Sequence, residues 1–192
     1  MSTRFEQLIE LSQQNPEAIR TELPEDCVRA AREFFLTQRD KIRKAHGIGD
    51  ASLIIVKSLS NTADFVVRGA AQLAAAALPA NASVLSRVCL CALGGYGRAE
   101  LSPYSDLDIC VVYETDLDDS LLEFNRYLVH FLWDVGFKVG HSLRTVGEAR
   151  ELAERDIKAF TSLLESRLIC GNPEIFAQLK LRVRELQQGE FA

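Results

Sequence analysis

The chain has 192 residues, enough for one domain with a substantial core or for a domain with a helical appendage. Hydrophobic residues make up 47% and charged residues 26%, which is the composition of a soluble globular protein. The net charge is -5 at pH 7, and this acidic balance argues against a protein that grips long nucleic acid through its phosphates.

The five cysteines favour a reducing compartment. They are Cys27, Cys89, Cys91, Cys110 and Cys170. An odd number, with three of them in apolar runs, indicates buried thiols rather than a disulfide framework. The N-terminus lacks the apolar stretch of a signal peptide, and the Ala-rich segment 69–80 is shorter than a membrane span. We therefore expect a cytoplasmic protein without a membrane partner.

Residues 1–80 predict a helical N-terminal arm. Residues 24–46 are strong helix formers with apolar side chains at helical spacing. Asp50 is placed to cap a second long helix, which runs to about residue 78 before Pro79 breaks it. Such helices either dock a partner protein or brace the rest of the chain, and the sequence does not separate these roles.

Residues 81–146 predict a small sheet. Residues 84–93 and 107–113 are apolar, β-favouring runs, and residues 137–145 alternate between apolar and polar as a third strand would. Between the last two strands, residues 121–135 place apolar side chains on one face of a helix.

Residues 147–192 predict a helical tail with a break at Gly171 to Pro173. The fold class is therefore α+β, a small sheet flanked by helices, with a helical N-terminal arm and a helical C-terminal tail.

Asp106 and Asp108 are separated by one residue at the start of the second strand. Side chains at i and i+2 of a strand point to the same face, so the two carboxylates project together while Leu107 and Ile109 enter the core. Neighbouring like charges raise each other's pKa unless a cation lies between them. Mg²⁺ or Mn²⁺, which bind hard oxygen ligands and substrate phosphates, suit this pair.

The glycines before this strand suit the same chemistry. Gly94 and Gly95 leave the backbone N–H groups open to the phosphates of a nucleoside triphosphate. Arg98 offers a guanidinium fork to phosphate oxygens, and Ser105 lies in the turn that returns the chain to the acids.

Each element alone has an ordinary explanation. A Gly-Gly-x-Gly segment is more often a simple turn, and Asp-x-Asp is more often a solvated strand end. A Rossmann motif does not fit, because Glu100 stands where a third glycine belongs, and a P-loop lacks its Gly-Lys-Ser/Thr. The pairing of both elements at strand ends, about ten residues apart, favours a nucleotide site.

The pattern of Gly-Gly followed by Asp-hydrophobic-Asp resembles the DNA polymerase β type of nucleotidyltransferase. Within that superfamily, LGGYGRAELSPYSDLDI is similar to the uridylyltransferases that modify the bacterial nitrogen-regulatory PII protein. FLWDVGFKVGHSLRTVGEA and TSLLESRLICGNPEIF resemble the same family, so the similarity covers about residues 85–185.

This resemblance implies a function and a role for each matched position. Asp106 and Asp108 would be catalytic and bind the metal, and Gly94 and Gly95 would hold the nucleotide phosphates with help from Arg98 and Ser105. UMP would pass from UTP to a tyrosine of a PII-type protein with release of pyrophosphate.

Members of the superfamily usually supply a third carboxylate from a later strand, yet residues 137–145 contain no Asp or Glu. His141, Ser142 and Arg144 are the polar residues there. The general base is therefore unassigned.

The candidates for the base outside that strand are Asp134, Glu148 and Asp156. Four arginines, at 144, 150, 155 and 167, either face a triphosphate or lie in surface ion pairs. Two other functions stay open: transfer of AMP to a different acceptor, and a regulatory domain that senses nucleotide without turnover.

Overall fold

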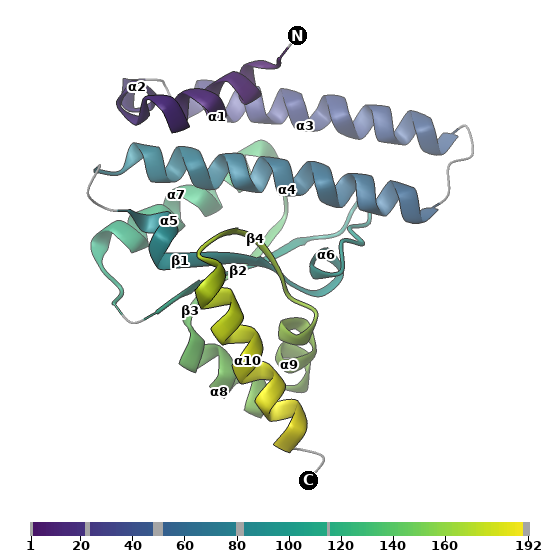
Figure 1. Ribbon diagram of the computed structural model, residues 1–192. Coiled ribbons are helices and arrows are strands. Elements are labelled where there is room, and N and C mark those ends of the chain that lie inside the picture. Colours follow the sequence, from purple (N-terminus) through teal and green to yellow (C-terminus); the bar gives the residue numbers. More distant parts are fainter. Residues whose placement is uncertain (1, 22–23, 48–51, 80–82, 115, 190–192) are drawn as a thin grey trace.

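The computed structural model describes residues 2–21, 24–47, 52–79, 83–114 and 116–189. The elements follow in chain order as α1 (Arg4–Gln14), α2 (Pro16–Thr21), α3 (Pro24–Gly47), α4 (Ser52–Ala77), α5 (Val84–Arg87), β1 (Val88–Ala92), α6 (Gly94–Gly97), β2 (Leu107–Tyr113), α7 (Asp119–Val135), β3 (Val139–Thr145), α8 (Val146–Arg155), α9 (Ile157–Leu164), β4 (Arg167–Gly171) and α10 (Pro173–Gly189) (Figure 1). A four-stranded mixed sheet flanked by helices confirms the expected α+β class.

The sheet has the strand order β3-β2-β1-β4. β1 is antiparallel to both β2 and β4, whereas β2 is parallel to β3. A parallel pair needs a crossover connection, and α7 provides it. Its apolar face packs on the sheet, and Asp118 begins the helix by accepting a hydrogen bond from the backbone N–H of Leu121.

Side chains alternate between two cores along the central strands. In β2, Leu107, Ile109 and Val111 enter the core shared with α1, α3, α4 and α7, as the sequence pattern predicts. Cys110 and Val112 enter a second core, formed with α8, α9 and α10. Figure 1 shows the N-terminal helices and α7 on one side of the sheet and α8, α9 and α10 on the other.

Helix α4 lies at the centre of the larger core. It packs against α1, α3 and α7, and it also contacts β4. The expected helix cap at Asp50 lies outside the described residues, and α4 begins at Ser52. Among the described helices, none combines the length and the apolar character needed to cross a lipid bilayer.

Two expectations about local structure were wrong. The first strand does not begin at residue 84, because residues 84–87 form the short helix α5, in which the backbone N–H and the hydroxyl of Ser86 both donate to the carbonyl of Ser83. The C-terminal tail is not wholly helical, because residues 167–171 form β4. That strand forms because β1 has a free edge, where Cys89 pairs with Gly171 and Ala92 with Arg167.

Candidate active site

Asp108 lies at the start of β2 on the sheet face that carries Cys110 and Val112. Asp108 is exposed, and so is Asp106, which precedes the strand. Partial burial, and after it the negative charge of Asp106, raise the pKa of the Asp108 carboxyl above its usual range. The charge of Asp106 thus adds to the effect of burial on Asp108.

The glycine turn lies beside Asp108. The backbone N–H of Leu93 donates to the carbonyl oxygen of Asp108 over 2.9 Å, which sets the end of β1 against the start of β2. Gly94 follows with a φ of +54°, a conformation that favours glycine. A Cβ atom on Gly94 would lie 3.9 Å from Oδ2 of Asp108, so the carboxylate faces the turn.

Helix α6 forms a single turn from Gly94, with Gly95 half-buried at its start. The preceding residue, Leu93, gives this turn no hydrogen bond from its side chain. The first N–H groups of the turn are thus left without the side-chain cap that most helices receive.

Gly140 also lies at the site, although it was not among the site residues predicted from the sequence. It pairs with Asp108 across the parallel strands β2 and β3. A Cβ atom on Gly140 would lie 2.4 Å from Oδ1 of Asp108, so the absence of a side chain there makes room for the carboxylate. Pairing with the second acid of the Asp-x-Asp motif was the signal that could have identified it.

Arg98 is held by two acids. Its Nε donates to Glu100 over 2.9 Å, and its Nη1 donates to Glu165 over 2.5 Å. The hydrogen bond to Glu100, followed by that to Glu165, raises the pKa of Arg98. Ser105 lies exposed in the loop before Asp106, where its backbone N–H donates to the carbonyl of Ser102.

A cavity of about 400 Å³ opens beside Asp108, between β2, β3, α8 and α9. Gly140, Arg144 and Lys158 also line it. In the parts of the chain that the structure describes, no carboxylate forms a salt bridge with either cation. Their positive charge is therefore available to an anion bound in the cavity.

Two other arginines of the C-terminal half, both on α8, have partners. Arg150 pairs with Glu154 and Arg155 pairs with Glu151, both along the exposed surface of α8. These two are ordinary surface ion pairs.

The candidate bases occupy three different settings. Glu148 accepts hydrogen bonds from the backbone N–H and the hydroxyl of Thr145 and so caps α8. Asp134 lines a separate cavity beside α3. Asp156 lines the cavity next to Asp108, but its Oδ1 already accepts from the backbone N–H of Lys158.

His141 turns toward α7. Its ring lies 6.1 Å from that of Trp133, edge to face, and Trp133 belongs to that helix. Asp108 belongs to the opposite face in the strand alternation, yet His141 also lines the cavity beside Asp108. Among the described residues, no group of three or more His, Cys, Asp or Glu side chains could hold a metal ion by itself.

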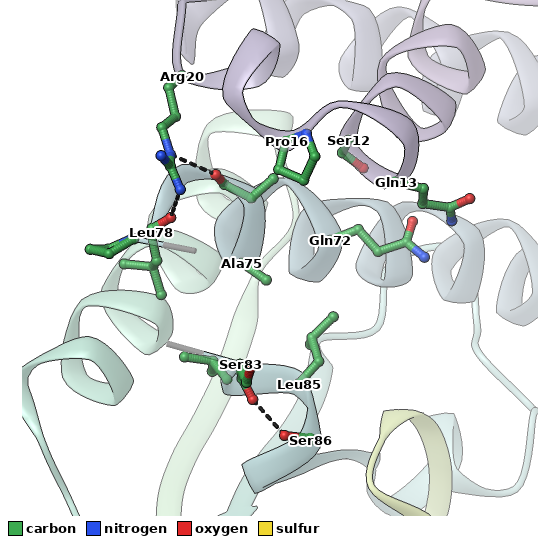
Figure 2. Close-up of a pocket in the computed structure, with 13 residues that line it drawn as sticks. Ser12, Gln13, Pro16, Arg20, Gln72, Ala75, Leu78, Ser83, Leu85 and Ser86 are labelled. Carbon is green, nitrogen blue, oxygen red and sulfur yellow. Dashed lines mark hydrogen bonds between the residues drawn. The ribbon is translucent and has the colours of Figure 1, made fainter. Parts of the chain in front are cut away.

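Another cavity, of about 490 Å³, lies at the C-terminal end of α4 (Figure 2). Its wall includes Gln13, Gln72 and Ser83, and Arg20 donates from α2 to the carbonyl oxygens of Ala76 and Leu78. Ser83 lies before β1, whereas the glycine turn follows that strand. This cavity and the cavity beside Asp108 are therefore at opposite ends of β1.

Comparisons with known proteins identify the family of the chain. Residues 38–148 match the family described as "Putative nucleotidyltransferase DUF294". A bifunctional uridylyltransferase/uridylyl-removing enzyme of Aromatoleum aromaticum is 40% identical over 146 residues, which are 76% of this chain and 16% of that protein.

Proteins with the same description give similar matches. The one from Vibrio atlanticus is 43% identical over 101 residues, covering 53% of this chain and 12% of that protein. The one from Caulobacter vibrioides is 41% identical over 102 residues, covering 52% and 10%. The chain thus spans less than a fifth of the length of these relatives, and the family match covers more than half of the chain. The chain belongs to the DUF294 family of nucleotidyltransferases.

Proposed function

We propose that this domain transfers UMP from UTP to a tyrosine hydroxyl of a PII-type signalling protein. The observation that carries the proposal is the position of the Asp108 carboxylate, between Gly94 and Gly140 at the edge of a cavity lined by two cations. The uridylyltransferase names of the relatives support the choice of UTP. The buried thiols of Cys89, Cys91 and Cys110 suit the cytoplasm that we propose as its location.

Asp106 and Asp108 fit a divalent cation. Both offer hard oxygen donors, and the raised pKa of Asp108, caused by burial and then by the charge of Asp106, reflects a repulsion that a cation would relieve. No third acid joins them among the described residues, so the remaining ligands would be substrate oxygens and water. When bound, Mg²⁺ or Mn²⁺ would offset negative charge on the phosphate oxygens.

The protein's own groups would bind and orient the triphosphate. The open N–H groups of Gly94 and Gly95 would bind phosphate oxygens, with Arg98 and Ser105 at the border of the turn. Arg144, aided by Lys158, would balance charge from the cavity side.

In the reaction, the tyrosine oxygen forms a bond to the α-phosphorus while the bond from that phosphorus to the bridging oxygen breaks. Pyrophosphate takes the bonding electrons, and the hydroxyl proton passes to solvent. The domain contributes mainly position and charge compensation.

The test is transfer of label to a purified PII protein from each of four labelled nucleoside triphosphates, with pyrophosphate measured in parallel. Label should come from UTP, and EDTA should stop the transfer. Asp108→Asn should lower the rate by at least ~100-fold without changing the circular dichroism spectrum, because it removes one charged oxygen donor. Full activity of Asp108→Asn would contradict the assignment, and labelling from ATP alone would replace UMP by AMP.

The absence of a third acid beside Asp108, among the described residues, favours a second candidate: a regulatory domain that binds nucleotide without turnover. This function predicts metal-dependent UTP binding in calorimetry and no pyrophosphate with any acceptor. The two functions therefore differ in one measurement, the release of pyrophosphate when UTP and a PII protein are both present.

A further inference from the structure

An ion pair between a buried carboxylate and a half-buried arginine lies behind the glycine turn. Asp64 on α4 is 6% exposed, and Arg167 begins β4. Nη1 of Arg167 lies 2.6 Å from Oδ2 of Asp64, and Nη2 lies 3.1 Å from Oδ1, which makes the pair bidentate. Two residues that are 103 positions apart in the chain are thereby joined.

The guanidinium of Arg167 also binds the glycine turn itself. Its Nε donates to the carbonyl oxygen of Gly97 over 3.3 Å, and its Nη2 donates to that of Tyr96 over 3.2 Å. Its centre lies 5.5 Å from the centroid of the Tyr96 ring. These carbonyls end the single turn of α6, and that of Tyr96 also accepts from the backbone N–H of Ala99 over 3.0 Å. Arg167 thus holds the turn from its C-terminal end.

Helix α4 reaches the same loop at a second point. The hydroxyl of Ser60, one helical turn before Asp64, accepts a hydrogen bond from the backbone N–H of Leu101 over 2.9 Å. Arg68, one turn after Asp64, donates to the carbonyl of Ile169 in β4 over 2.9 Å. Three polar side chains on one face of α4 therefore hold the catalytic loop and the edge strand, and Figure 1 shows α6 beneath this helix.

The turn also has little room to move against the segment that leads into β4. A Cβ atom on Gly97 would lie 2.5 Å from the carbonyl oxygen of Glu165, just before β4. Backbone thus packs directly on backbone here, and Arg167 donates to the carbonyl of Gly97 beside this contact. A shift of Arg167 would be passed to Gly94 and Gly95, which begin the same turn.

We infer that Asp64 and Arg167 are positioning residues that fix the N–H groups of the glycine turn for the nucleotide phosphates. The inference rests on the proposed function. It gives α4, the long helix of the N-terminal arm, the role of bracing the rest of the chain. The sequence did not distinguish this role from docking a partner protein. Because displacement by about 1 Å can lower a rate ~100-fold, loss of this support should be visible in nucleotide binding even when the fold survives.

The test is the double variant Asp64→Leu/Arg167→Met. Replacing both partners by apolar residues of similar volume leaves no buried carboxylate without its arginine, and Arg68, which lies 3.7 Å from Oδ2 of Asp64, is half-exposed and stays solvated. This variant should therefore fold. Its Kd for UTP with Mg²⁺, measured by calorimetry, should rise ~10-fold or more. Hydrogen exchange of the amides in residues 94–100 should accelerate by a similar factor, while that of α7 stays as in the wild type.

The matched control is Arg20→Met. Arg20 also donates to two backbone carbonyls at an end of α4, as Figure 2 shows, but at the end far from the site. Its loss should leave both the UTP Kd and the exchange of residues 94–100 unchanged. Arg167→Lys keeps the positive charge but loses the two-pronged guanidinium, so it should give an intermediate Kd for UTP. It also serves as a second variant if the double variant does not fold.

Wild-type values of both the UTP Kd and the exchange of residues 94–100, in the double variant or in Arg167→Lys, would overturn the inference. Uniform acceleration of hydrogen exchange in all elements would also overturn it, because the ion pair would then only stabilise the fold as a whole. If the wild-type protein binds no UTP, the proposed function fails, and the exchange comparison still decides whether this pair holds the turn.

Discussion

The Asp108 carboxylate occupies the space where a side chain at position 140 would begin. A Cβ atom built on Gly140 lies 2.4 Å from Oδ1 of Asp108, and the two residues are partners across β2 and β3. One glycine in the neighbouring strand therefore decides where the metal-binding acid of the proposed site can lie.

Gly140→Ala should reduce transfer activity far more than stability. The Asp108 side chain can rotate away from the new methyl group at a cost in stability of about 1 kcal/mol. The rotation moves the carboxylate oxygens away from their position in the site, so kcat/KM should fall ~100-fold. Gly147→Ala is the matched control, because its Cβ would meet the Thr145 hydroxyl oxygen at an ordinary 3.8 Å. Equal activity of the two variants would show that the contact at Gly140 is irrelevant to the site.

Arg144→Gln should weaken nucleotide binding more than Arg98→Gln does. Arg144 lines the cavity, and no carboxylate forms a salt bridge with it in the described chain, whereas Arg98 already pairs with Glu100 and Glu165. Losing one charge-assisted hydrogen bond to phosphate should raise the KM for UTP ~10-fold for Arg144→Gln and less than ~3-fold for Arg98→Gln. The reverse order in steady-state kinetics would assign the phosphate contact to Arg98.

The cysteines should resist alkylation in the folded protein. Burial raises the pKa of Cys110 to about 11 and that of Cys170 to about 12. Since only the thiolate reacts, both thiols should react slowly with iodoacetamide near pH 8. Their alkylation rates should keep rising with pH beyond the ordinary thiol pKa of about 8.5. Mass spectrometry should find all five sites modified after unfolding in urea, and rapid labelling of native Cys110 would contradict its burial.

Thr145→Ala should destabilise the fold by ~1 kcal/mol, because Thr145 caps α8 through a reciprocal pair of hydrogen bonds with Glu148. Thr161→Ala is the control, since its hydroxyl donates only to the carbonyl of Ile157 on the surface of α9, and a change within ~0.5 kcal/mol is expected. Urea unfolding followed by circular dichroism measures both. Identical midpoints would show that the cap contributes nothing.

The sequence predicted the parts of the site that depend on short-range geometry. Alternation along β2 sends Ile109 to one core and Cys110 to the other, so the face on which Asp108 lies follows from spacing alone. The glycine turn and the acids were likewise visible as a pair. The prediction failed at residues 84–87, where Ser86 bonds to Ser83 and forms a helical turn inside a β-favouring run, and at residues 167–171, where the strand depends on pairing with the distant β1.

Sequence alone determined the class of fold, the order of its main helices and strands, and the pair of acids beside a glycine turn, because these follow from periods of two and 3.6 residues and from backbone freedom at glycine. Tertiary structure decided that Gly140 faces Asp108, that Arg144 opens to the cavity while Arg98 is held by acids, and that Asp64 reaches Arg167. Those relationships depend on which strand edges meet and which helix crosses the sheet, and residues so far apart in the chain leave no local pattern that would predict them.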